Sequence, residues 1–111
     1  MPFISRTPEP PYYAVVFTSI NADVDHTEHS EMFRRLAARA RDYEGYLGIE
    51  AARNTDGTGV AAVYWKDAES IAAWARDPEH RVAKRRGREE WYTHYMIRIC
   101  QVEREYGRRD E

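Results

Sequence analysis

The sequence predicts an α+β fold of the ferredoxin-like type, with an antiparallel sheet that carries its helices on one face. The apolar segments follow one another as strand, helix, strand, strand, helix, strand, which is the order of a βαββαβ unit. Between the two middle strands stands NTDGTG, at residues 54–59, whose residue types tolerate the positive φ of tight hairpins. A chain of 111 residues can bury one modest core but not two, so we expect a single domain.

The chain begins with a proline-rich segment followed by a buried strand. Residues 1–11 include Pro2, Pro8, Pro10 and Pro11, and proline fixes φ and removes a donor, so this segment is predicted to be an extended arm. Residues 12–20, YYAVVFTSI, are dense in aromatic and β-branched side chains and are predicted to form a buried strand. We place the folded domain at residues 12–106 and a polar tail at residues 107–111.

An amphipathic helix is predicted after this strand. It should begin between Asp25 and Thr27, where Asp25 and Glu28 form a weak capping pattern. Gly45 is expected to end it, because glycine readily takes the left-handed conformation beyond a helix. Apolar residues recur at three- and four-residue steps along one helix face: Met32, Phe33, Leu36, Ala37, Ala40 and Tyr43.

The second half of the chain supplies a hairpin, a broken helix and a last strand. Residues 46–53 and 60–65 are predicted to be antiparallel partners. A short helix capped by Asp67 should run through Trp74 and stop at Asp77, because the residue before a proline avoids the helical region. The second short helix is placed at residues 79–90. Within it, Gly87 indicates a break or the close approach of another backbone.

The last strand is predicted to run from Tyr92 to about Tyr106. About 15 residues is much longer than the usual five or six. The simplest explanation is that its end pairs with a second subunit, which would also cover exposed sheet edges. Packing two sheets back to back would cover the face without helices. The sequence therefore predicts a homodimer.

Composition excludes several classes of protein. The net charge of −2 lacks the large positive field of a general nucleic-acid binder, so no nucleic-acid partner is expected. The sequence has neither a signal-like leader nor an apolar run of about 18 residues, so we expect a cytoplasmic protein without a membrane partner. The single Cys100 lies in an alternating apolar segment and is predicted to be a buried structural thiol.

Common catalytic and cofactor motifs are missing from the sequence. There is no GxSxG, no GxGxxG after a strand, no P-loop and no CxxC. His26 and His29 are spaced closely enough at a helix start to share a metal ion. The helix pattern places them on the solvent-facing side, however, so a surface cap is the preferred interpretation and no metal site is predicted.

The aromatic segment between Val63 and Tyr95 contains all three tryptophans. Trp65 should end the third strand and Trp74 should lie on the following helix. An aromatic-walled pocket between the helices and the sheet would suit a flat apolar substrate. The alternative is that these tryptophans only fill the core. Five residues are the substrate-binding candidates: Trp65 and Trp74 together with Phe17, Arg88 and Tyr92.

His80 is the candidate catalytic base, because its ordinary pKa near 6.5 suits proton transfer at neutral pH. Removing a proton from a phenol or an enolisable ring leaves an electron-rich anion that can reduce dioxygen directly, without a metal. The competing interpretation is a capping or packing histidine beside Pro78. The basic run from Arg81 to Arg88 is interpreted as a solvated helix face, with an anion clamp as the alternative.

Several segments, in their order and spacing, resemble the antibiotic biosynthesis monooxygenase superfamily, and most closely its small stand-alone bacterial members. They are PYYAVVFTS (11–19), GYLGIEAARNTDGTGVAAVYW (45–65), AESIAAW (68–74), PEH (78–80), GREEWYTHY (87–95) and VERE (102–105). The resemblance implies a dimeric α+β barrel whose subunits exchange their C-terminal strands. It also implies a pocket between the sheet and the helices of each subunit.

The resemblance implies one of two oxygenase functions, although other members are isomerases or have no known activity. One branch consists of cofactor-independent oxygenases that form quinones, and Trp65 matches the tryptophan that lines their site. The haem-degrading branch has an asparagine on the first strand and a histidine ten residues after a helix tryptophan. Trp74 matches that tryptophan, but ten residues later stands Lys84, and YYAVVFTSI holds no asparagine. We therefore predict a cofactor-independent monooxygenase acting on a small aromatic or phenolic molecule, with haem binding or a non-catalytic ligand-binding dimer as alternatives.

Overall fold

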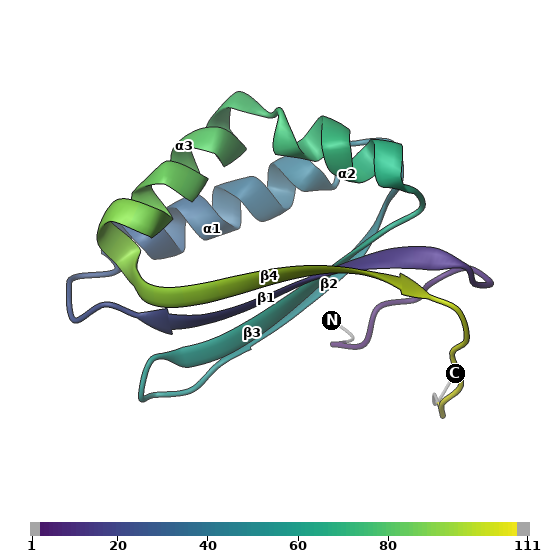
Figure 1. Ribbon diagram of the computed structural model, residues 1–111, viewed down its shortest axis with the longest axis horizontal. Coiled ribbons are helices and arrows are strands. Elements are labelled where there is room, and N and C mark those ends of the chain that lie inside the picture. Colours follow the sequence, from purple (N-terminus) through teal and green to yellow (C-terminus); the bar gives the residue numbers. More distant parts are fainter. Residues whose placement is uncertain (1–2, 109–111) are drawn as a thin grey trace.

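Helices cover one face of a four-stranded antiparallel sheet in the computed structural model, which describes residues 3–108 (Figure 1). The strands lie in the order β2-β3-β1-β4, and the predicted βαββαβ succession is confirmed. The elements are β1 (Tyr12–Asn21), α1 (Thr27–Ala40), β2 (Tyr46–Arg53), β3 (Thr58–Trp65), α2 (Ala68–Ala75), α3 (Pro78–Arg86), the π-helical segment η1 (Gly87–Trp91) and β4 (Tyr92–Val102).

Strand β1 is the central element, because it pairs with β3 on one side and β4 on the other. Tyr13 lies opposite Trp65 near the start of β1, and Asn21 lies opposite Tyr92 at its end. Trp65 of β3 and Tyr92 of β4 therefore lie beside opposite ends of β1. The space between sheet and helices extends from one of these residues to the other.

The β2–β3 hairpin forms at the predicted turn. Gly57 has a φ of 91°, in the region where glycine carries no steric penalty. The Asp56 carboxylate accepts a hydrogen bond from the Thr58 backbone N–H at 2.9 Å, and the Asn54 N–H donates to the Thr58 carbonyl at 2.7 Å. These local bonds fix the register of two strands that make up one half of the sheet.

Helix α1 starts within the predicted range but ends earlier than predicted. It starts at Thr27, whose N–H donates to Asp25 Oδ1 at 2.9 Å, but the expected reciprocal pattern with Glu28 does not form. It ends at Ala40 because the chain tightens there: the Tyr43 N–H donates to the Ala40 carbonyl three residues back, at 3.0 Å. Tyr43 thus belongs to the following turn, where Gly45 takes the expected positive φ of 92°.

A single buried carboxylate separates α2 from α3. Asp77 is 1% exposed and caps α3 by accepting from the N–H groups of Glu79 and His80 at 3.0 and 3.1 Å. Its second oxygen accepts from Arg39 and from the Tyr43 hydroxyl, each at 2.6 Å. The predicted break at Asp77-Pro78 is confirmed, and the same residue fastens α3 to α1 and to the turn after it.

The second short helix changes character at Gly87. The α-helix ends at Arg86 and a π-helical turn leads into β4. A Cβ atom at Gly87 would stand 2.9 Å from Cε2 of Tyr92, so glycine is needed for the close approach of an aromatic ring. The predicted break at Gly87 is confirmed; the alternative, close approach of another backbone, is not what the structure shows, since the neighbour is a side chain.

Strand β4 is shorter than predicted. It contains 11 residues and pairs with β1 over its full length, from Tyr92 to Val102, while residues 103–108 carry no strand. The inference of a second subunit from an overlong strand was therefore wrong in its premise. The burial predicted for Cys100 was also wrong: the thiol is exposed, because β4 is an edge strand and no helix covers its outer side (Figure 1).

The N-terminal arm packs on its own sheet. The Ser5 N–H donates to Glu50 Oε2 on β2 at 2.9 Å, and the Thr7 hydroxyl donates to Glu105 at 2.7 Å. Residues before and after the domain core are thus joined at one side of the molecule. None of the helices in the described part of the chain is long and apolar enough to cross a membrane.

Candidate functional site

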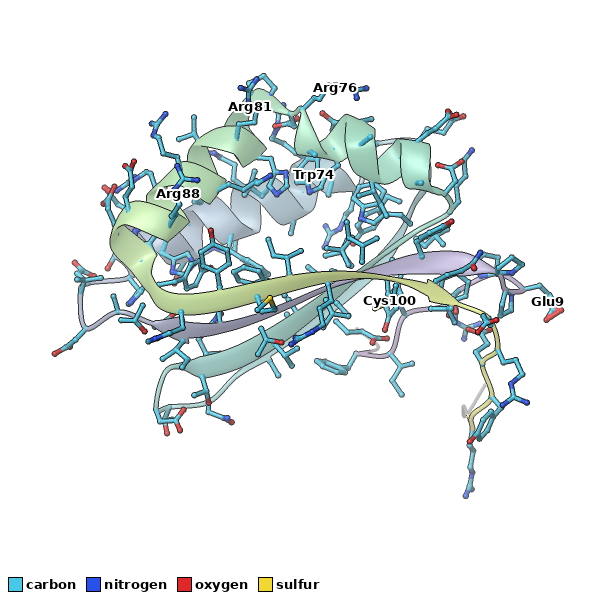
Figure 2. All side chains as sticks on the ribbon, in the orientation of Figure 1. Glu9, Trp74, Arg76, Arg81, Arg88 and Cys100 are labelled. Atoms are coloured by element: carbon cyan, nitrogen blue, oxygen red, sulfur yellow. The ribbon has the colours of Figure 1, made fainter. Side chains whose placement is uncertain are left out.

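A cavity of about 320 Å³ lies between the sheet and the helices, and its walls are mainly apolar. It reaches solvent along β4, because Tyr95 and Ile97 line it and are 41% and 42% exposed. Figure 2 shows Trp74 between the helical layer and the sheet. The cavity wall includes every side chain proposed from the sequence as a site residue: His80, Trp65, Trp74, Phe17, Arg88 and Tyr92.

One end of the cavity, which we call the tryptophan end, consists of Trp65, Trp74 and His80. The Trp65 ring is 1% exposed and lies 6.2 Å from Trp74 between ring centroids. The His80 imidazole stacks on Trp74 at 4.6 Å with an interplanar angle of 16°. Tyr43, which also holds Asp77, meets the other side of Trp74 edge-on at 5.1 Å. These rings are fixed by packing from several sides.

His80 combines a structural contact with a free nitrogen. Its Nδ1 lies 3.0 Å from the Trp74 carbonyl, and since a carbonyl oxygen only accepts, Nδ1 carries the proton. Burial lowers the pKa of His80, so the ring is neutral at pH 7 and Nε2 holds a lone pair. No residue in the range 3–108 forms a hydrogen bond with that Nε2. The packing role and the base role proposed from the sequence are therefore compatible.

The opposite end of the cavity, which we call the tyrosine end, consists of Phe17, Tyr92 and Tyr95. Phe17 lies 5.2 Å from Tyr92 and 5.8 Å from Tyr95 between ring centroids. The Tyr92 hydroxyl lies 2.7 Å from Nε2 of His29. Burial raises the pKa of Tyr92, so the phenol keeps its proton at neutral pH. This end therefore presents a polar oxygen within an aromatic wall.

His29 and His26 were predicted to face solvent at the start of the helix, and that prediction was wrong. Both are half-buried, and His29 stacks on Trp91 at 4.5 Å with an interplanar angle of 10°. Their three-residue spacing was visible, but nothing local showed that Trp91 and Tyr92, which are more than 60 residues away in the sequence, would contact His29. The described residues contain no group of three or more His, Cys, Asp or Glu side chains able to hold a metal.

The basic run on α3 and η1 serves two purposes. Arg86 pairs with Glu28 at 3.1 Å and Glu90 at 2.9 Å, which makes it part of the scaffold. Lys84 and Arg88 instead line the cavity, and neither forms an ion pair within residues 3–108. Among the described residues they are the only lysine and arginine in the cavity wall, and none of the described carboxylates lines it. The site is thus apolar with a positive rim.

Other polar side chains of the sheet lie away from this cavity. Tyr64 faces the other side of the sheet and donates to Glu50 Oε1 at 2.7 Å, and Tyr13 does not contribute to the cavity wall. Asn21, the last residue of β1, is likewise absent from the wall. The strand therefore does end in an asparagine, but not one that reaches the site.

Comparison with known proteins identifies relatives along nearly the whole chain. The sequence profile described as monooxygenase af470-like matches residues 18–100. The uncharacterized protein YqjZ of Bacillus subtilis (strain 168) is 42% identical over 105 residues, which span 95% of this chain and 91% of that protein. A relationship of this extent includes both ends of the cavity.

Solved structures share the fold at low sequence identity. SnoaB, a cofactor-independent oxygenase from Streptomyces nogalater, superposes with a TM-score of 0.72 at 15% identity, covering 86% of this chain and 97% of its own. A protein described as an antibiotic biosynthesis monooxygenase gives a TM-score of 0.70 at 10% identity, covering 81% and 97%. These similarities establish the architecture around the cavity.

Proposed function

Because the chain belongs to the monooxygenase af470-like family, within the antibiotic biosynthesis monooxygenase superfamily, we propose that it is a cofactor-independent monooxygenase for a small aromatic or phenolic substrate. One observation carries this proposal. An apolar cavity with aromatic walls holds a neutral imidazole whose Nε2 is free to accept a proton. That is the arrangement that deprotonation of a flat carbon acid or phenol requires.

The proposed reaction starts at the tryptophan end. The substrate ring packs against Trp65 and Trp74, and His80 Nε2 takes a proton from an activated ring CH₂ group or a phenol. The resulting anion gives electrons to dioxygen and combines with it as a peroxide. Loss of water then leaves a carbonyl, so CH₂ and O₂ become C=O and H₂O. Both oxygen atoms and all electrons are accounted for without an external reductant.

Lys84 and Arg88 suggest a narrower substrate class. Two cations near an apolar cavity without a carboxylate in its wall favour an aromatic molecule that carries a negatively charged group, since ionic hydrogen bonds are stronger than neutral ones. Arg88 is exposed and stands on the segment that leads into β4 (Figure 2). We place the anionic group there and the reacting ring deeper, beside Trp74.

Oxygen uptake tests the proposed reaction. Purified protein is supplied with anthrone, with hydroquinones, and with carboxylated versions of both. We expect uptake in the wild type and a reduction of kcat by about 10²-fold or more in His80→Ala, the usual contribution of a general base. His94→Ala is the matched control, because His94 is exposed and stands outside the cavity wall. Unchanged turnover in His80→Ala would remove the base assignment.

Titration with haem separates the alternatives. Lys84 occupies the position where the haem-degrading branch has its histidine, and no observation in the structure favours haem. We expect no shifted Soret band. Tight binding of an aromatic ligand without oxygen uptake would instead support a non-catalytic ligand-binding protein.

We also propose that the chain forms a homodimer through the uncovered side of its sheet. Met96 and Val60 are 54% and 48% exposed on strands that no helix covers from that side, and an exposed apolar surface favours association. Sedimentation equilibrium should give a dimer mass at micromolar concentration, and Met96→Lys should give a monomer. A monomeric wild type at that concentration would end this proposal.

A further inference from the structure

A row of hydrogen-bonded side chains leads away from the tyrosine end of the cavity. The Tyr92 hydroxyl lies 2.7 Å from His29 Nε2, and His29 Nδ1 lies 2.9 Å from His26 Nδ1. His26 Nε2 in turn lies 2.8 Å from the carbonyl oxygen of Ala22. Tyr92 is part of the cavity wall, whereas Ala22 and His26 flank the exposed residues 23–25. The row therefore connects the cavity with the surface.

The positions of the protons in this row follow from the hydrogen bond between His26 Nε2 and the Ala22 carbonyl oxygen. A carbonyl oxygen only accepts, so His26 Nε2 must carry hydrogen. In the neutral ring, His26 Nδ1 is then bare and His29 Nδ1 must donate to it. His29 Nε2 is consequently bare and accepts from the Tyr92 hydroxyl. Every donor in the row therefore points from the cavity towards the surface.

We propose that Tyr92, His29 and His26 form a proton relay that carries the proton of a bound phenol from the cavity to solvent. The inference rests on the proposed function for the phenol, but the relay itself is a property of this chain. The substrate O–H bond breaks and its proton passes to the Tyr92 oxygen, while the Tyr92 proton moves to His29 Nε2. The proton on His29 Nδ1 moves to His26 Nδ1. The products are a substrate phenolate and a His26 imidazolium, which water deprotonates.

The surroundings suit His29 to passing a proton on without retaining it. Burial, followed by the charges of His26 and Arg53, lowers the pKa of His29 to about 4. The ring is therefore neutral at pH 7 and a lasting imidazolium is unfavourable there. Stacking on Trp91 fixes the plane of the His29 ring. Tyr92 is the partner of His29 in the hydrogen bond that starts the row. The close contact between Gly87 and Tyr92 limits the movement of the Tyr92 ring.

The two ends of the cavity would then accept different protons of the same substrate. Oxidation of a hydroquinone to a quinone removes two protons and two electrons, and dioxygen becomes hydrogen peroxide. His80 can take one proton with its free Nε2, but its Nδ1 is held by a backbone carbonyl. The relay provides a second acceptor with a route to the surface. A hydroquinone bound with one hydroxyl group at each end would use both.

The relay can be tested in the resting protein, independently of any reaction. In full-length protein labelled with ¹⁵N-histidine, side-chain NMR at pH 7 should show His26 protonated on Nε2 and His29 protonated on Nδ1. Tyr92→Phe should shift the His29 Nε2 resonance, and His94→Gln should leave it in place. Finding His29 protonated on Nε2 in the wild type would overturn the relay, whatever the enzyme assays show.

A phenol probe tests the connection to the cavity. Saturation with 1-naphthol should move the resonances of His29 and His26 in the wild type, and both responses should be lost in Tyr92→Phe. Resonances that do not move at saturation would overturn the relay, whereas failure of 1-naphthol to bind would count against the proposed aromatic site.

Turnover provides the third comparison. If a hydroquinone is oxidised, His29→Phe should lower kcat about 10²-fold with KM changed less than about twofold, and adding Tyr92→Phe should lower it little further because both act in one unit. A kcat equal to that of the wild type would overturn the relay and leave the oxygenase proposal intact. No oxygen uptake by the wild type, together with the expected tautomers and naphthol response, would overturn the oxygenase proposal and leave the relay.

Discussion

The two ends of the cavity join aromatic rings to a histidine in different ways. At the tryptophan end, His80 is tied to a backbone carbonyl and its helix is fastened by the buried Asp77. At the tyrosine end, Tyr92 begins an edge strand and its hydroxyl continues into two half-buried histidines. Packing from several sides suits one end to holding a ring in place. A route for protons and an exposed edge suit the other to exchange with solvent.

The largest expected effect concerns the buried anchor of the tryptophan end. Asp77→Ala removes the cap of α3 together with the hydrogen bonds that Arg39 and Tyr43 donate to its carboxylate, although Arg39 keeps its ion pair with Glu79. We expect the free energy of unfolding to fall by about 3 kcal/mol, measured in urea. Asp67→Ala is the matched control, because Asp67 only caps α2, and should cost about 1 kcal/mol. Equal losses would show that the tryptophan end has no special anchor.

Acid should act through the same carboxylate. Burial alone would raise the pKa of Asp77, but hydrogen bonds from Arg39 and Tyr43 outweigh it and hold that pKa well below its ordinary range. A carboxyl group with a lowered folded-state pKa stabilises the fold above its unfolded pKa near 4, and this contribution is lost as pH falls towards the folded value. Between pH 5 and 2 the wild type should therefore lose more stability than Asp77→Asn. Parallel pH curves of the two proteins would contradict this.

The tyrosine end is tested by filling the space at Gly87. The new methyl group of Gly87→Ala would press on Tyr92, at an overpacking cost of about 1–3 kcal/mol, offset by about 0.5–1 kcal/mol of helix preference for alanine. We expect a net loss near 1 kcal/mol and a shifted His29 resonance with an unchanged His80 resonance. Movement of both histidines would mean that the two ends are not independent.

The smallest expected effect concerns the positive rim. Arg88→Ala should raise KM for a carboxylated anthrone or hydroquinone about fivefold, which corresponds to about 1 kcal/mol for an exposed charge pair. The neutral parent compound should be unaffected, as should either substrate in Arg81→Ala, because Arg81 is exposed and is not part of the cavity wall. An equal increase in KM for charged and neutral substrates would argue against charge recognition.

Local signals in the sequence predicted most of the architecture, because the hairpin at residues 54–59, the cap at Asp67 and the break at Asp77-Pro78 each depend on neighbouring residues. Cys100 shows where such reasoning stops. Alternation indicated a strand, but whether a strand lies at the edge or in the centre depends on sheet order. The predicted length of β4 was wrong for the same reason: the strand ends where its partner does, and Val102 is the last residue with a partner on β1.

The site was predictable as a collection of residues and not as a set of contacts. Trp65, Trp74 and His80 were expected to come together because they are near one another in the sequence. His29 was not, because its contacts with Trp91 and Tyr92 span some 60 residues. The free Nε2 of His80 also depends on a carbonyl contact that sequence spacing does not reveal.

The exposed stretch of β4 has a consequence for regulation. Tyr95, Ile97 and Ile99 line the cavity and are also open to solvent, so any surface that packs over them alters entry to the cavity. Occupancy of the cavity and coverage of the edge are then linked equilibria. A ligand that favours the covered state strengthens association by the same factor by which association strengthens its own binding. Ligand affinity would accordingly depend on the concentration of any partner that covers this stretch of β4.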